Sequence, residues 1–386
     1  MKILNINMTL DPVNGGGTAV RTVQMSKSLV KSGVECTILT LNLGLTPEFL
    51  KAFKHIKIIA LPCMNKRFYF PRPSLDLIKM VMNLAREADL IHIMGHWTLI
   101  NALVYFSVHR FKKPYVVCPA GAMPLFGRSK WLKRLYNFIV GRRIMRNASA
   151  WIAITPAEIS YFESFGIPSS RVTVIPNGIN QEDFLEQDTK AFRYRKGLSD
   201  HPIILFMGRL NTIKGPDLLI KAFILICRLI PDHHLVFAGP DEGMQSSLLE
   251  MAKQNGVSER VHFLGYVGGD EKSALYHAAS VLVVSSRQEA MSIVALEAGI
   301  CGTPVIVTDQ CGFGEIKSID PALEVPASAE GIANSLAGLL TEPGKREKVA
   351  SSFRDFVSQR YTWDRIVKEY LHLYKELLNE SGIKEI

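Results

Sequence analysis

Two series of short apolar runs, separated by longer segments of helical period, constrain the fold more than any other feature of this sequence. The helical segments include Ala19–Lys31 and Leu75–Arg86. Runs that are apolar nearly throughout, with amphipathic helices between them, indicate parallel sheets that are covered on both faces. The two series therefore predict an α/β protein with two Rossmann-like, doubly wound domains. The first series comprises residues 2–7, 36–41, 57–61, 89–94, 114–119, 150–155 and 171–176, and the second comprises residues 203–208, 234–239, 261–265, 281–286, 304–309 and 322–326.

The junction between the domains is expected near the turn Pro176-Asn177-Gly178, because a polar, charge-rich stretch without a strand pattern follows it. A chain of 386 residues is too long for one ordinary core. We predict an N-terminal domain over residues 1–180, a C-terminal domain over residues 181–361 and a closing helix over about 362–380. Ligands of open α/β sheets bind beyond the carboxyl ends of the strands. The cleft between two such domains is therefore the expected site.

Charge is divided unequally between the two halves. Residues 1–180 hold 23 Lys and Arg against 8 Asp and Glu, whereas the remainder holds 22 against 28. Domains of opposite charge are expected to have different partners. The six cysteines form no Cys-x-x-Cys pair, which favours reduced thiols in a cytoplasmic protein. The polar start of the chain does not resemble a signal peptide, and polar residues interrupt the longest uncharged stretch, so we expect no membrane-spanning helix.

A glycine-rich loop follows the first predicted strand. It reads Asn14-Gly15-Gly16-Gly17-Thr18 and opens a helix. Glycines allow a ligand to approach the backbone closely, and a helix N-terminus offers free N–H groups to an anion. The sequence favours a phosphate close to Gly15, Gly16 and Gly17 over a tight turn without a ligand. The second strand ends in Thr40-Leu41-Asn42, without the acid that an NAD site requires.

Arg209 and Lys214 stand together in the loop after the first strand of the second domain. Pro216 suits the first turn of the helix that follows. Two cations in one loop at the expected site favour a bound diphosphate over a pair of solvated surface charges. Hydrogen bonds to charged groups contribute about 1.5–3 kcal/mol each, and these cations gain importance if charge grows on the phosphate as a bond breaks.

The most specific segment runs from Ser285 to Gly299 and places Glu289 and Glu297 eight positions apart. Glu297 lies in an otherwise apolar helix, where a carboxylate without hydrogen-bond donors would be costly. The two hydroxyls of a sugar diol would supply such donors. A buried ion pair within the protein is the alternative interpretation. Glu289 is either a sugar contact or a loop acid stabilised by the helix dipole. If helical geometry held throughout, the interval would span about 12 Å, close to the reach from a ribose to a transferred sugar. Amides of Ser292, Ile293 and Val294 begin the helix and are candidates for the same diphosphate.

Together these segments resemble glycosyltransferase family 4, the retaining group 1 glycosyltransferases of the GT-B fold. The resemblance covers nearly the whole chain, and its most specific part is the Glu289/Glu297 segment. The remaining parts are the glycine loop, residues 175–179, Gly208-Arg209-Leu210 with Lys214-Gly215, residues 238–243 and residues 302–305.

The resemblance implies a retaining, hexosyltransferase-type enzyme that takes its sugar from a nucleotide-diphosphate donor in polysaccharide or glycolipid assembly. It implies that Arg209 and Lys214 hold the diphosphate, that Glu289 contacts the donor sugar and that Glu297 takes the ribose hydroxyls. The loop around Tyr266 and Val267 would face the base. Met291, Ser292, Ile293 and Val294 complete the predicted donor site, and the closing helix is expected to pack back on the first domain.

The chain departs from the family pattern where a histidine is usual. Ala120 stands at that position, in the sequence Cys118-Pro119-Ala120-Gly121. His96, after the strand at residues 89–94, is either a substitute that contacts sugar or acceptor or a partly buried structural imidazole. A retaining reaction does not require a protein base, since the departing phosphate oxygen can take the acceptor's proton. The sequence holds no Asp-x-Asp motif, so we expect no metal and no cofactor.

A basic stretch without acids lies between Asp89 and Glu158. Within it, residues 129–140 are predicted to form a helix with Leu132, Leu135 and Ile139 on one face. The cations Lys130, Lys133 and Arg134, with Trp131 among them, favour contact with an anionic bilayer over a solvated basic face. We therefore expect peripheral attachment to the inner face of a membrane and a lipid-linked or glycan acceptor, and no nucleic acid.

Two other functions fit the same sequence. A nucleotide-sugar epimerase of the same architecture would convert its donor without an acceptor. A non-catalytic module that binds a membrane or a partner is favoured by Ala120, but it predicts no nucleotide binding, whereas Arg209, Lys214 and Glu297 together predict some.

Overall fold

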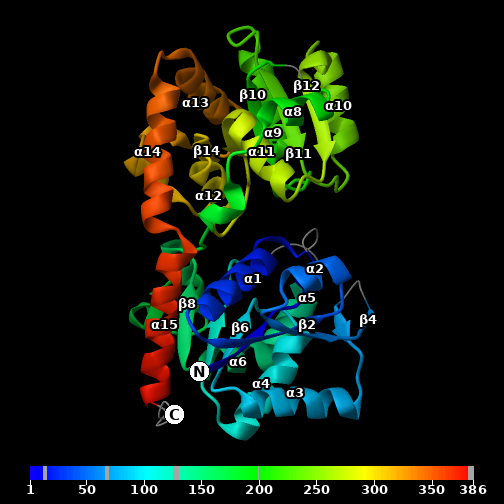
Figure 1. The fold of residues 1–386 in the computed structure, drawn as a ribbon, viewed down its shortest axis with the longest axis vertical. Coiled ribbons are helices and arrows are strands. Elements are labelled where there is room, and N and C mark those ends of the chain that lie inside the picture. Colours follow the sequence, from blue (N-terminus) through cyan, green and yellow to red (C-terminus); the bar gives the residue numbers. More distant parts are fainter. Residues whose placement is uncertain (12–14, 66–68, 125–129, 199, 381–386) are drawn as a thin grey trace. The chain divides into compact units, whose positions relative to one another are not determined.

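The computed structural model describes residues 1–11, 15–65, 69–124, 130–198 and 200–380 of the chain. It divides into two compact units: residues 1–178 together with the segment from Trp363 onward, and residues 179–362. The predicted domains, 1–180 and 181–361 with a closing helix over 362–380, lie within a few residues of these limits. Figure 1 shows each unit as strands of one sheet with helices around it.

Unit 1, as we call the first, contains a seven-stranded parallel sheet in the order β3-β2-β1-β6-β7-β8-β9. All seven strands coincide with the apolar runs of the first predicted series. The sequence did not predict the antiparallel hairpin β4–β5 (Cys63–Asn65 and Phe70–Pro71). The sheet strands are β1 (Lys2–Ile6), β2 (Glu35–Leu41), β3 (Lys57–Leu61), β6 (Leu90–Met94), β7 (Tyr115–Cys118), β8 (Ala150–Ala153) and β9 (Val172–Val174).

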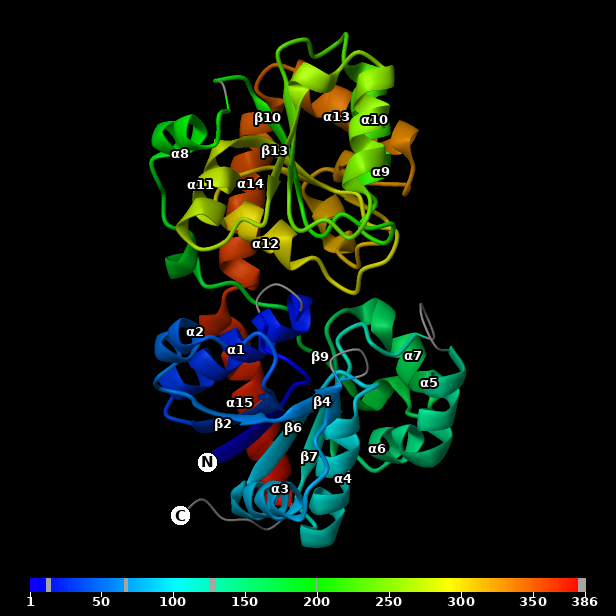
Figure 2. The ribbon, with the colours of Figure 1, turned by 90° about the vertical axis from the view of Figure 1, so that its right-hand side faces the viewer.

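Helices cover both faces of this sheet. Helix α1 (Gly16–Lys31) packs beside α15 (Trp363–Glu380), and α3 (Leu75–Glu87) packs beside α4 (Leu99–Phe111). Right-handed connections place these two pairs on opposite faces, as Figures 1 and 2 show. Side-chain oxygens of Ser74 and Thr98 accept from the first-turn amides of α3 and α4, which fixes where these helices begin. The remaining helices are α2 (Pro47–Ala52), α5 (Lys130–Tyr136), α6 (Arg142–Arg146) and α7 (Ile159–Ser164), with a π-helical turn, η1, over Asn137–Gly141.

Unit 2 contains a six-stranded parallel sheet in the order β12-β11-β10-β13-β14-β15. Its strands are β10 (Ile203–Met207), β11 (His234–Ala238), β12 (Val261–Gly265), β13 (Ala279–Val284), β14 (Val305–Thr308) and β15 (Glu324–Val325). Its helices are α8 (Thr189–Arg195), α9 (Pro216–Ile226), α10 (Gln245–Gln254), α11 (Asp270–Ala278), α12 (Ile293–Ile300), α13 (Ala329–Thr341) and α14 (Lys345–Arg360). The central strands are buried almost completely, which explains why their sequences are apolar nearly throughout. Both sheets confirm the predicted α/β, doubly wound class.

Helix α15 belongs to unit 1 although 184 residues of unit 2 precede it. Its apolar stripe, which includes Ile366, Val367 and Leu378, is buried, as its helical period predicted. The ring of Trp363 covers Gly178, where a Cβ atom would lie 2.7 Å from the indole. Only glycine therefore fits at the last residue of the first segment of unit 1.

Candidate functional site

The switch point of the unit 2 sheet lies between β10 and β13. From β10 the chain proceeds through β11 to β12 at one edge, and it returns to β13 on the other side before β14 and β15. Both strands are parallel, so the loops that follow them leave the same edge of the sheet. Ligands of open α/β sheets bind at such a switch point, where two connections diverge. The two loops, together with helix α12 that follows the second one, carry most of the residues that the sequence predicted for the donor.

The loop after β10 begins at Gly208 and carries Arg209 and Lys214. Gly239 approaches it so closely that a Cβ atom would lie 1.9 Å from the Gly208 oxygen. The guanidinium of Arg209 lies 3.0 Å from the carboxylate of Glu242, and both side chains are about 40% exposed. Asn211 donates to the other carboxylate oxygen at 2.6 Å. Arg209 is thus half-exposed beside an acid that the sequence did not assign to the site.

Lys214 and Glu289 meet between the two loops. The ammonium lies 2.9 Å from Oε1 of Glu289, and the two side chains are 24% and 15% exposed. Ser286 donates to the other oxygen of Glu289 at 3.0 Å, and the Glu289 amide donates to the Gln310 carbonyl at 2.8 Å. The structure therefore brings together two of the predicted catalytic residues, which are 75 positions apart in the sequence.

The segment from Glu289 to Glu297 is helical only in part. Helix α12 begins at Ile293, so the assumption of continuous helical geometry, and the span of about 12 Å based on it, do not apply. Met291 and Ile293 are buried, and Val294 is half-buried. Ser292, the residue before α12, is fully buried, and its hydroxyl has no hydrogen-bond partner within the part of the chain that the structure describes. A buried polar group without a partner is costly and is a candidate for a ligand contact.

Glu297 is buried and has two donors from helix α11. Lys272 lies 2.6 Å from Oε2 and donates to Oε1 at 2.7 Å, and the Tyr276 hydroxyl donates to Oε2 at 2.6 Å. Burial, followed by the neighbouring Glu297, raises the pKa of Tyr276 well above its ordinary value. The structure thus gives Glu297 the buried ion pair that was the alternative interpretation of this residue, and its ribose contact stays a prediction.

The remaining predicted donor residues belong to other loops of the two units. Tyr266 and Val267 follow β12; the phenol ring is 53% exposed, and the valine is buried. In unit 1, Gly15 precedes helix α1, and a Cβ atom there would lie 2.6 Å from the Asp11 oxygen. Gly16 has a φ of +60°, and Gly17 is exposed. Asn14, which opens the predicted loop, lies outside the described residues.

His96 follows β6 but does not reach solvent. It is 2% exposed, its Nε2 lies 2.8 Å from Oδ1 of Asn137, and the rings of Trp97, Tyr136 and Phe165 pack edge-on against it. Burial lowers the pKa of His96 to about 4, although the hydrogen bond with Asn137 acts in the opposite direction. This geometry favours the structural imidazole, the second of the two interpretations of His96.

Ala120 adopts a left-handed backbone conformation with a φ of +47°, which is uncommon for a residue with a side chain. The next amide, of Gly121, donates to the buried carboxylate of Glu158, which also accepts from the Ile154 amide at 2.7 Å. The loop that lacks the expected histidine is therefore held by a buried acid of unit 1.

The basic stretch forms helices over residues 130–146, with η1 between α5 and α6. The predicted helix 129–140 is therefore longer than expected, and Ser129 lies outside the described residues. Leu132 is half-buried, as is Tyr136, whereas Leu135 and Ile139 are exposed. The common face of Leu132, Leu135 and Ile139 stays a prediction. The exposed apolar side chains are Trp131 (66% exposed), Leu135, Phe138 (84% exposed) and Ile139.

The predicted cations of this stretch differ in exposure. Lys130 and Arg134 are exposed, whereas Lys133 is half-buried with its ammonium 5.4 Å from the ring centre of Trp97. Burial lowers the pKa of Lys133. Within the described ranges no helix is long and apolar enough to cross a membrane.

Sequence reasoning missed the partners that hold the predicted residues. Lys272 and Tyr276 are four positions apart on α11, a spacing that places them on one face of a helix and was the only available signal. Glu242 lies in residues 238–243, a segment that carries the resemblance, but no role was predicted for it, and Asn211 is a polar loop residue without a distinguishing pattern. Among the residues that the structure describes, no group of three or more His, Cys, Asp or Glu side chains is arranged to hold a metal ion.

Two family models match the chain in succession. The model of Glycosyltransferase Family 4 matches residues 15–183, and the model of Glycosyl transferases group 1 matches residues 188–355. Together they cover most of both units.

Curated relatives agree with these models. The chain is 36% identical over 227 residues to the uncharacterized glycosyltransferase MJ1607 of Methanocaldococcus jannaschii, a match that covers 56% of this chain and 57% of that protein. It is 32% identical over 326 residues to a D-inositol 3-phosphate glycosyltransferase of Salinispora tropica, covering 76% of this chain and 67% of that protein.

Solved structures share the fold over nearly the full length. Anabaena Alr3699/HepE in complex with UDP and glucose matches with a TM-score of 0.80 at 20% identity, covering 97% of this chain and all of that one. Sucrose-phosphate synthase from Thermosynechococcus elongatus matches with a TM-score of 0.80 at 22% identity, covering 98% and 100%. These findings confirm the resemblance drawn from the sequence: the chain belongs to glycosyltransferase family 4 and is a group 1 glycosyltransferase of the GT-B fold.

Proposed function

We propose that this glycosyltransferase moves a sugar, with retention and without a metal ion, from a nucleoside-diphosphate donor to a hydroxyl of a glycan or lipid-linked acceptor. The observation that carries the proposal is the meeting of Lys214 and Glu289 at the switch point of the unit 2 sheet, with Arg209 on the same loop. The crystal structures of Anabaena HepE with UDP and with UDP-glucose support a donor of this class.

Arg209 and Lys214 supply the positive charge for the diphosphate in this proposal. Each now pairs with a carboxylate, Glu242 and Glu289 respectively, at 2.9–3.0 Å. The pair of Arg209 and Glu242 is about 40% exposed, and exposed pairs contribute only about 0–1 kcal/mol; the pair of Lys214 and Glu289 is less exposed. A diphosphate that carries more charge than one carboxylate can therefore displace them. First-turn amides of α12 and the unpartnered hydroxyl of Ser292 supply further donors.

Glu289, once released by the phosphate, is free to accept from hydroxyls of the donor sugar. Glu297 accepts hydrogen bonds from the ribose hydroxyls in this proposal. It keeps its hydrogen bonds from Lys272 and Tyr276 when the ribose binds. The exposed ring of Tyr266 offers a surface for the base, whereas the side chain of the neighbouring Val267 is buried.

The reaction needs no protein base in this scheme. The bond between the anomeric carbon and the diphosphate oxygen breaks, and the acceptor oxygen bonds to the same carbon on the face that the phosphate leaves. The acceptor proton passes to the departing phosphate oxygen. Arg209 and Lys214 stabilise the charge that grows there. The presence of Ala120 at the histidine position and the burial of His96 are compatible with this scheme.

For the acceptor side, we propose that unit 1 docks on the cytoplasmic leaflet of an anionic membrane. The exposed apolar residues Trp131, Leu135, Phe138 and Ile139 lie among cations in a stretch without acids. Apolar side chains and flanking cations together favour the interface of an anionic bilayer. We expect the wild-type protein to partition onto vesicles of phosphatidylglycerol, and the variant with Glu at 130, 133 and 134 to lose this partitioning. Unchanged partitioning of that variant would refute the membrane contact.

A thermal-shift screen of UDP, GDP, ADP and their sugar derivatives tests the donor class. A ligand at a hundred times its dissociation constant stabilises the protein by about 2.7 kcal/mol. An NMR time course with the sugar donor that binds then separates the activities. Conversion of the donor without an acceptor would indicate an epimerase, and the absence of any nucleotide binding would indicate a non-catalytic module.

A further inference from the structure

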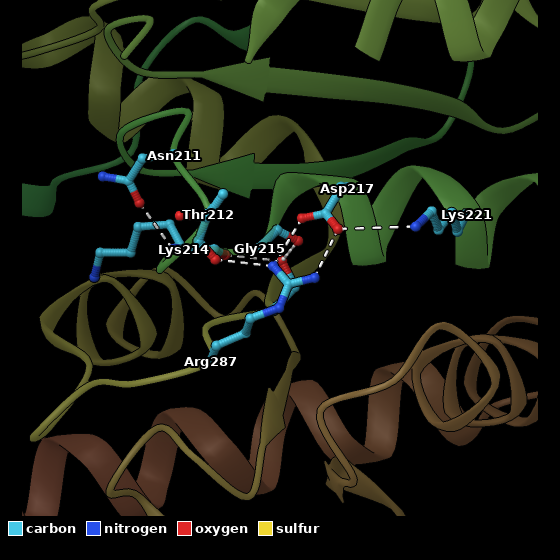
Figure 3. Close-up of polar contacts among 8 residues, drawn as sticks. Asn211, Thr212, Lys214, Gly215, Asp217, Lys221 and Arg287 are labelled. Atoms are coloured by element: carbon cyan, nitrogen blue, oxygen red, sulfur yellow. Dashed lines mark hydrogen bonds and ion pairs between the residues drawn. The ribbon is translucent and has the colours of Figure 1, made fainter. Parts of the chain in front are cut away.

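Arg287 stands in the loop after β13 but makes its contacts with the loop after β10. Its backbone amide donates to the Ile213 carbonyl at 2.7 Å, and its Nη1 donates to the Thr212 carbonyl at 2.8 Å. Both terminal nitrogens also reach Asp217 in the first turn of α9, at 2.8 and 2.6 Å. Figure 3 shows the guanidinium between the carboxylate of Asp217 and the loop that leads to Lys214. One side chain therefore ties the start of α9 to the loop before it.

The backbone on both sides of Lys214 is held in the same way. The amide of Lys214 donates to Oδ1 of Asn211 at 2.9 Å. The hydroxyl of Ser285 donates to the Gly215 carbonyl at 2.8 Å. Gly215 has a φ of +66°, and a Cβ atom there would lie 2.2 Å from the Ser285 oxygen, so the two loops touch through backbone atoms. The backbone on both sides of Lys214 is thus held by side chains, and the contacts of Arg287 add two hydrogen bonds to the carbonyls of Thr212 and Ile213.

The geometry of the ion pair explains why arginine stands at position 287. The planar guanidinium donates two parallel hydrogen bonds to the carboxylate of Asp217, and its Nη1 also donates to the Thr212 carbonyl. A lysine ammonium has no such planar pair of donors. Burial favours the neutral form of Asp217, but the hydrogen bonds and charge of Arg287 outweigh it and lower the pKa of the carboxyl. The pair is therefore charged at neutral pH. Ion pairs with a partly exposed member, such as Arg287, contribute little to the free energy of unfolding. We therefore expect this pair to order the loop around it more than to stabilise the whole unit.

We propose that Arg287 is a positioning residue: it fixes the Gly208–Gly215 loop so that Lys214 is held where the diphosphate binds. Arg287 does not itself touch the donor. This inference rests on the proposed function, because it assigns the fixed lysine to a diphosphate. A lysine side chain loses rotamer freedom when it binds a ligand, and this loss costs free energy. A backbone that is already fixed removes the additional cost of ordering the loop.

The binding experiment compares Arg287→Gln with Lys221→Ala. Lys221 is the matched control, because its ammonium lies 4.0 Å from the same carboxylate of Asp217 but its side chain is half-exposed on α9. Dissociation constants are measured for UDP, GDP and ADP and for the nucleosides uridine, guanosine and adenosine. We expect Arg287→Gln to weaken diphosphate binding by about tenfold or more and nucleoside binding by less than about twofold. Lys221→Ala should change neither. Equal losses for diphosphates and nucleosides would overturn the inference.

A double variant tests whether Arg287 acts through Lys214. In the Lys214→Ala background, Arg287→Gln should cause no additional loss of diphosphate affinity, since the lysine that it positions is absent. Asp217→Asn, which breaks the same contact from the other side, should reproduce the effect of Arg287→Gln. Additive losses in the double variant would mean that Arg287 binds the diphosphate directly, and the positioning role would be wrong.

Amide hydrogen exchange of the ligand-free protein tests the positioning role of Arg287 without any nucleotide. Its result therefore does not depend on whether the proposed function is right. We expect the amides of Lys214 and Gly215 to exchange faster in Arg287→Gln than in the wild type and to be unchanged in Lys221→Ala. Unchanged protection in Arg287→Gln would overturn the positioning role even if the wild type binds UDP. If the wild-type protein binds none of the diphosphates, the proposed function fails, and the assignment of Lys214 to a diphosphate fails with it.

Discussion

The two units are built alike but use charged and titratable residues in opposite ways. In unit 2, Arg209 and Lys214 are partly exposed in the loop at the carboxyl end of β10, and each faces one carboxylate. In unit 1, Arg21 and His92 are buried completely and bond to groups of unit 1 itself, while the Nε atom of Arg21 and the Nε2 atom of His92 have no hydrogen-bond partner among the described residues. A charged or titratable side chain is therefore not enough for a ligand site. The partners must also be ones that a ligand can displace.

Arg21 illustrates the second use. From helix α1 it donates to Oδ1 of Asn177 at 2.6 Å, to the Ile175 carbonyl at 2.8 Å and to the hydroxyl of Tyr370 on α15. His92 on β6 bonds through Nδ1 to the Tyr374 hydroxyl at 2.6 Å. These neutral partners come from the strand end before the junction and from α15. The buried cation therefore holds the last helix on unit 1.

The largest effect is expected from Arg21→Met. It removes the three hydrogen bonds that Arg21 donates to buried oxygens of Asn177, Ile175 and Tyr370, at a cost of about 3–5 kcal/mol of the free energy of unfolding. All four tryptophans belong to unit 1, so tryptophan fluorescence during urea unfolding measures this unit. Arg86→Met, at an exposed site of the same unit, should cost less than about 0.5 kcal/mol. Equal unfolding midpoints for the two variants would contradict the role of Arg21.

A pH dependence of unit 1 is the next largest effect. Burial, together with the charge of Arg21, lowers the pKa of His92 to about 3, and burial lowers that of His96 to about 4. The unfolded chain takes up protons near pH 6.5, whereas these folded histidines do not. The stability that they contribute is therefore complete above pH 6.5 and is lost as the pH falls toward 4.

Each histidine should contribute a slope of about 1.4 kcal/mol per pH unit within this window. Urea unfolding of the wild type between pH 7 and pH 5, followed by tryptophan fluorescence, measures the total slope. His92→Gln should reduce the slope by about half. A stability of unit 1 that stays constant down to pH 5 would show that these imidazoles are protonated in the folded protein.

In unit 2, Lys214→Ala should weaken the binding of UDP, GDP or ADP, whichever the wild type prefers, by about 10- to 100-fold. This range corresponds to the loss of one charge-assisted hydrogen bond. Calorimetric titration measures the affinity, and the fluorescence unfolding curve of unit 1 should not move. If Lys214→Ala keeps the full affinity of the wild type, Lys214 does not bind the diphosphate, and the contrast between ligand-binding cations in unit 2 and structural ones in unit 1 fails.

The smallest effect is expected from Glu242→Gln. Its carboxylate competes with the diphosphate for Arg209, so its neutralisation should raise diphosphate affinity by about two- to fivefold. Glu250→Gln, at an exposed position on α10, serves as the control and should leave the affinity unchanged. A lower affinity in Glu242→Gln would show that this acid supports the site instead of competing with the ligand.

The fold was largely predictable because its determinants are local in the sequence. The central strands are runs of mostly apolar residues that no amphipathic helix resembles, as residues 281–284 of β13 show. The short hairpin β4–β5 was missed because its residues lack alternation and are mostly exposed. The π-helical turn at Asn137–Gly141 was also missed, since an ordinary helical period does not reveal a local change of register.

The site was predictable only where the loop after a strand carries the chemistry. Lys214 and Glu289 follow strands, so their meeting could be inferred from the topology of a parallel sheet. The partners of Glu297 could not, because Lys272 reaches it from a separate helix whose packing the sequence does not encode locally. Arg21 on α1 was not recognised either, since a cation on an amphipathic helix is usually exposed.

A crystal structure with the nucleoside diphosphate that binds most tightly tests the central claim most directly. Our account predicts both phosphates within hydrogen-bond distance of Arg209 and Lys214, with Glu242 and Glu289 released from these cations. Phosphates bound elsewhere, with the ion pairs between Arg209 and Glu242 and between Lys214 and Glu289 intact, would contradict it.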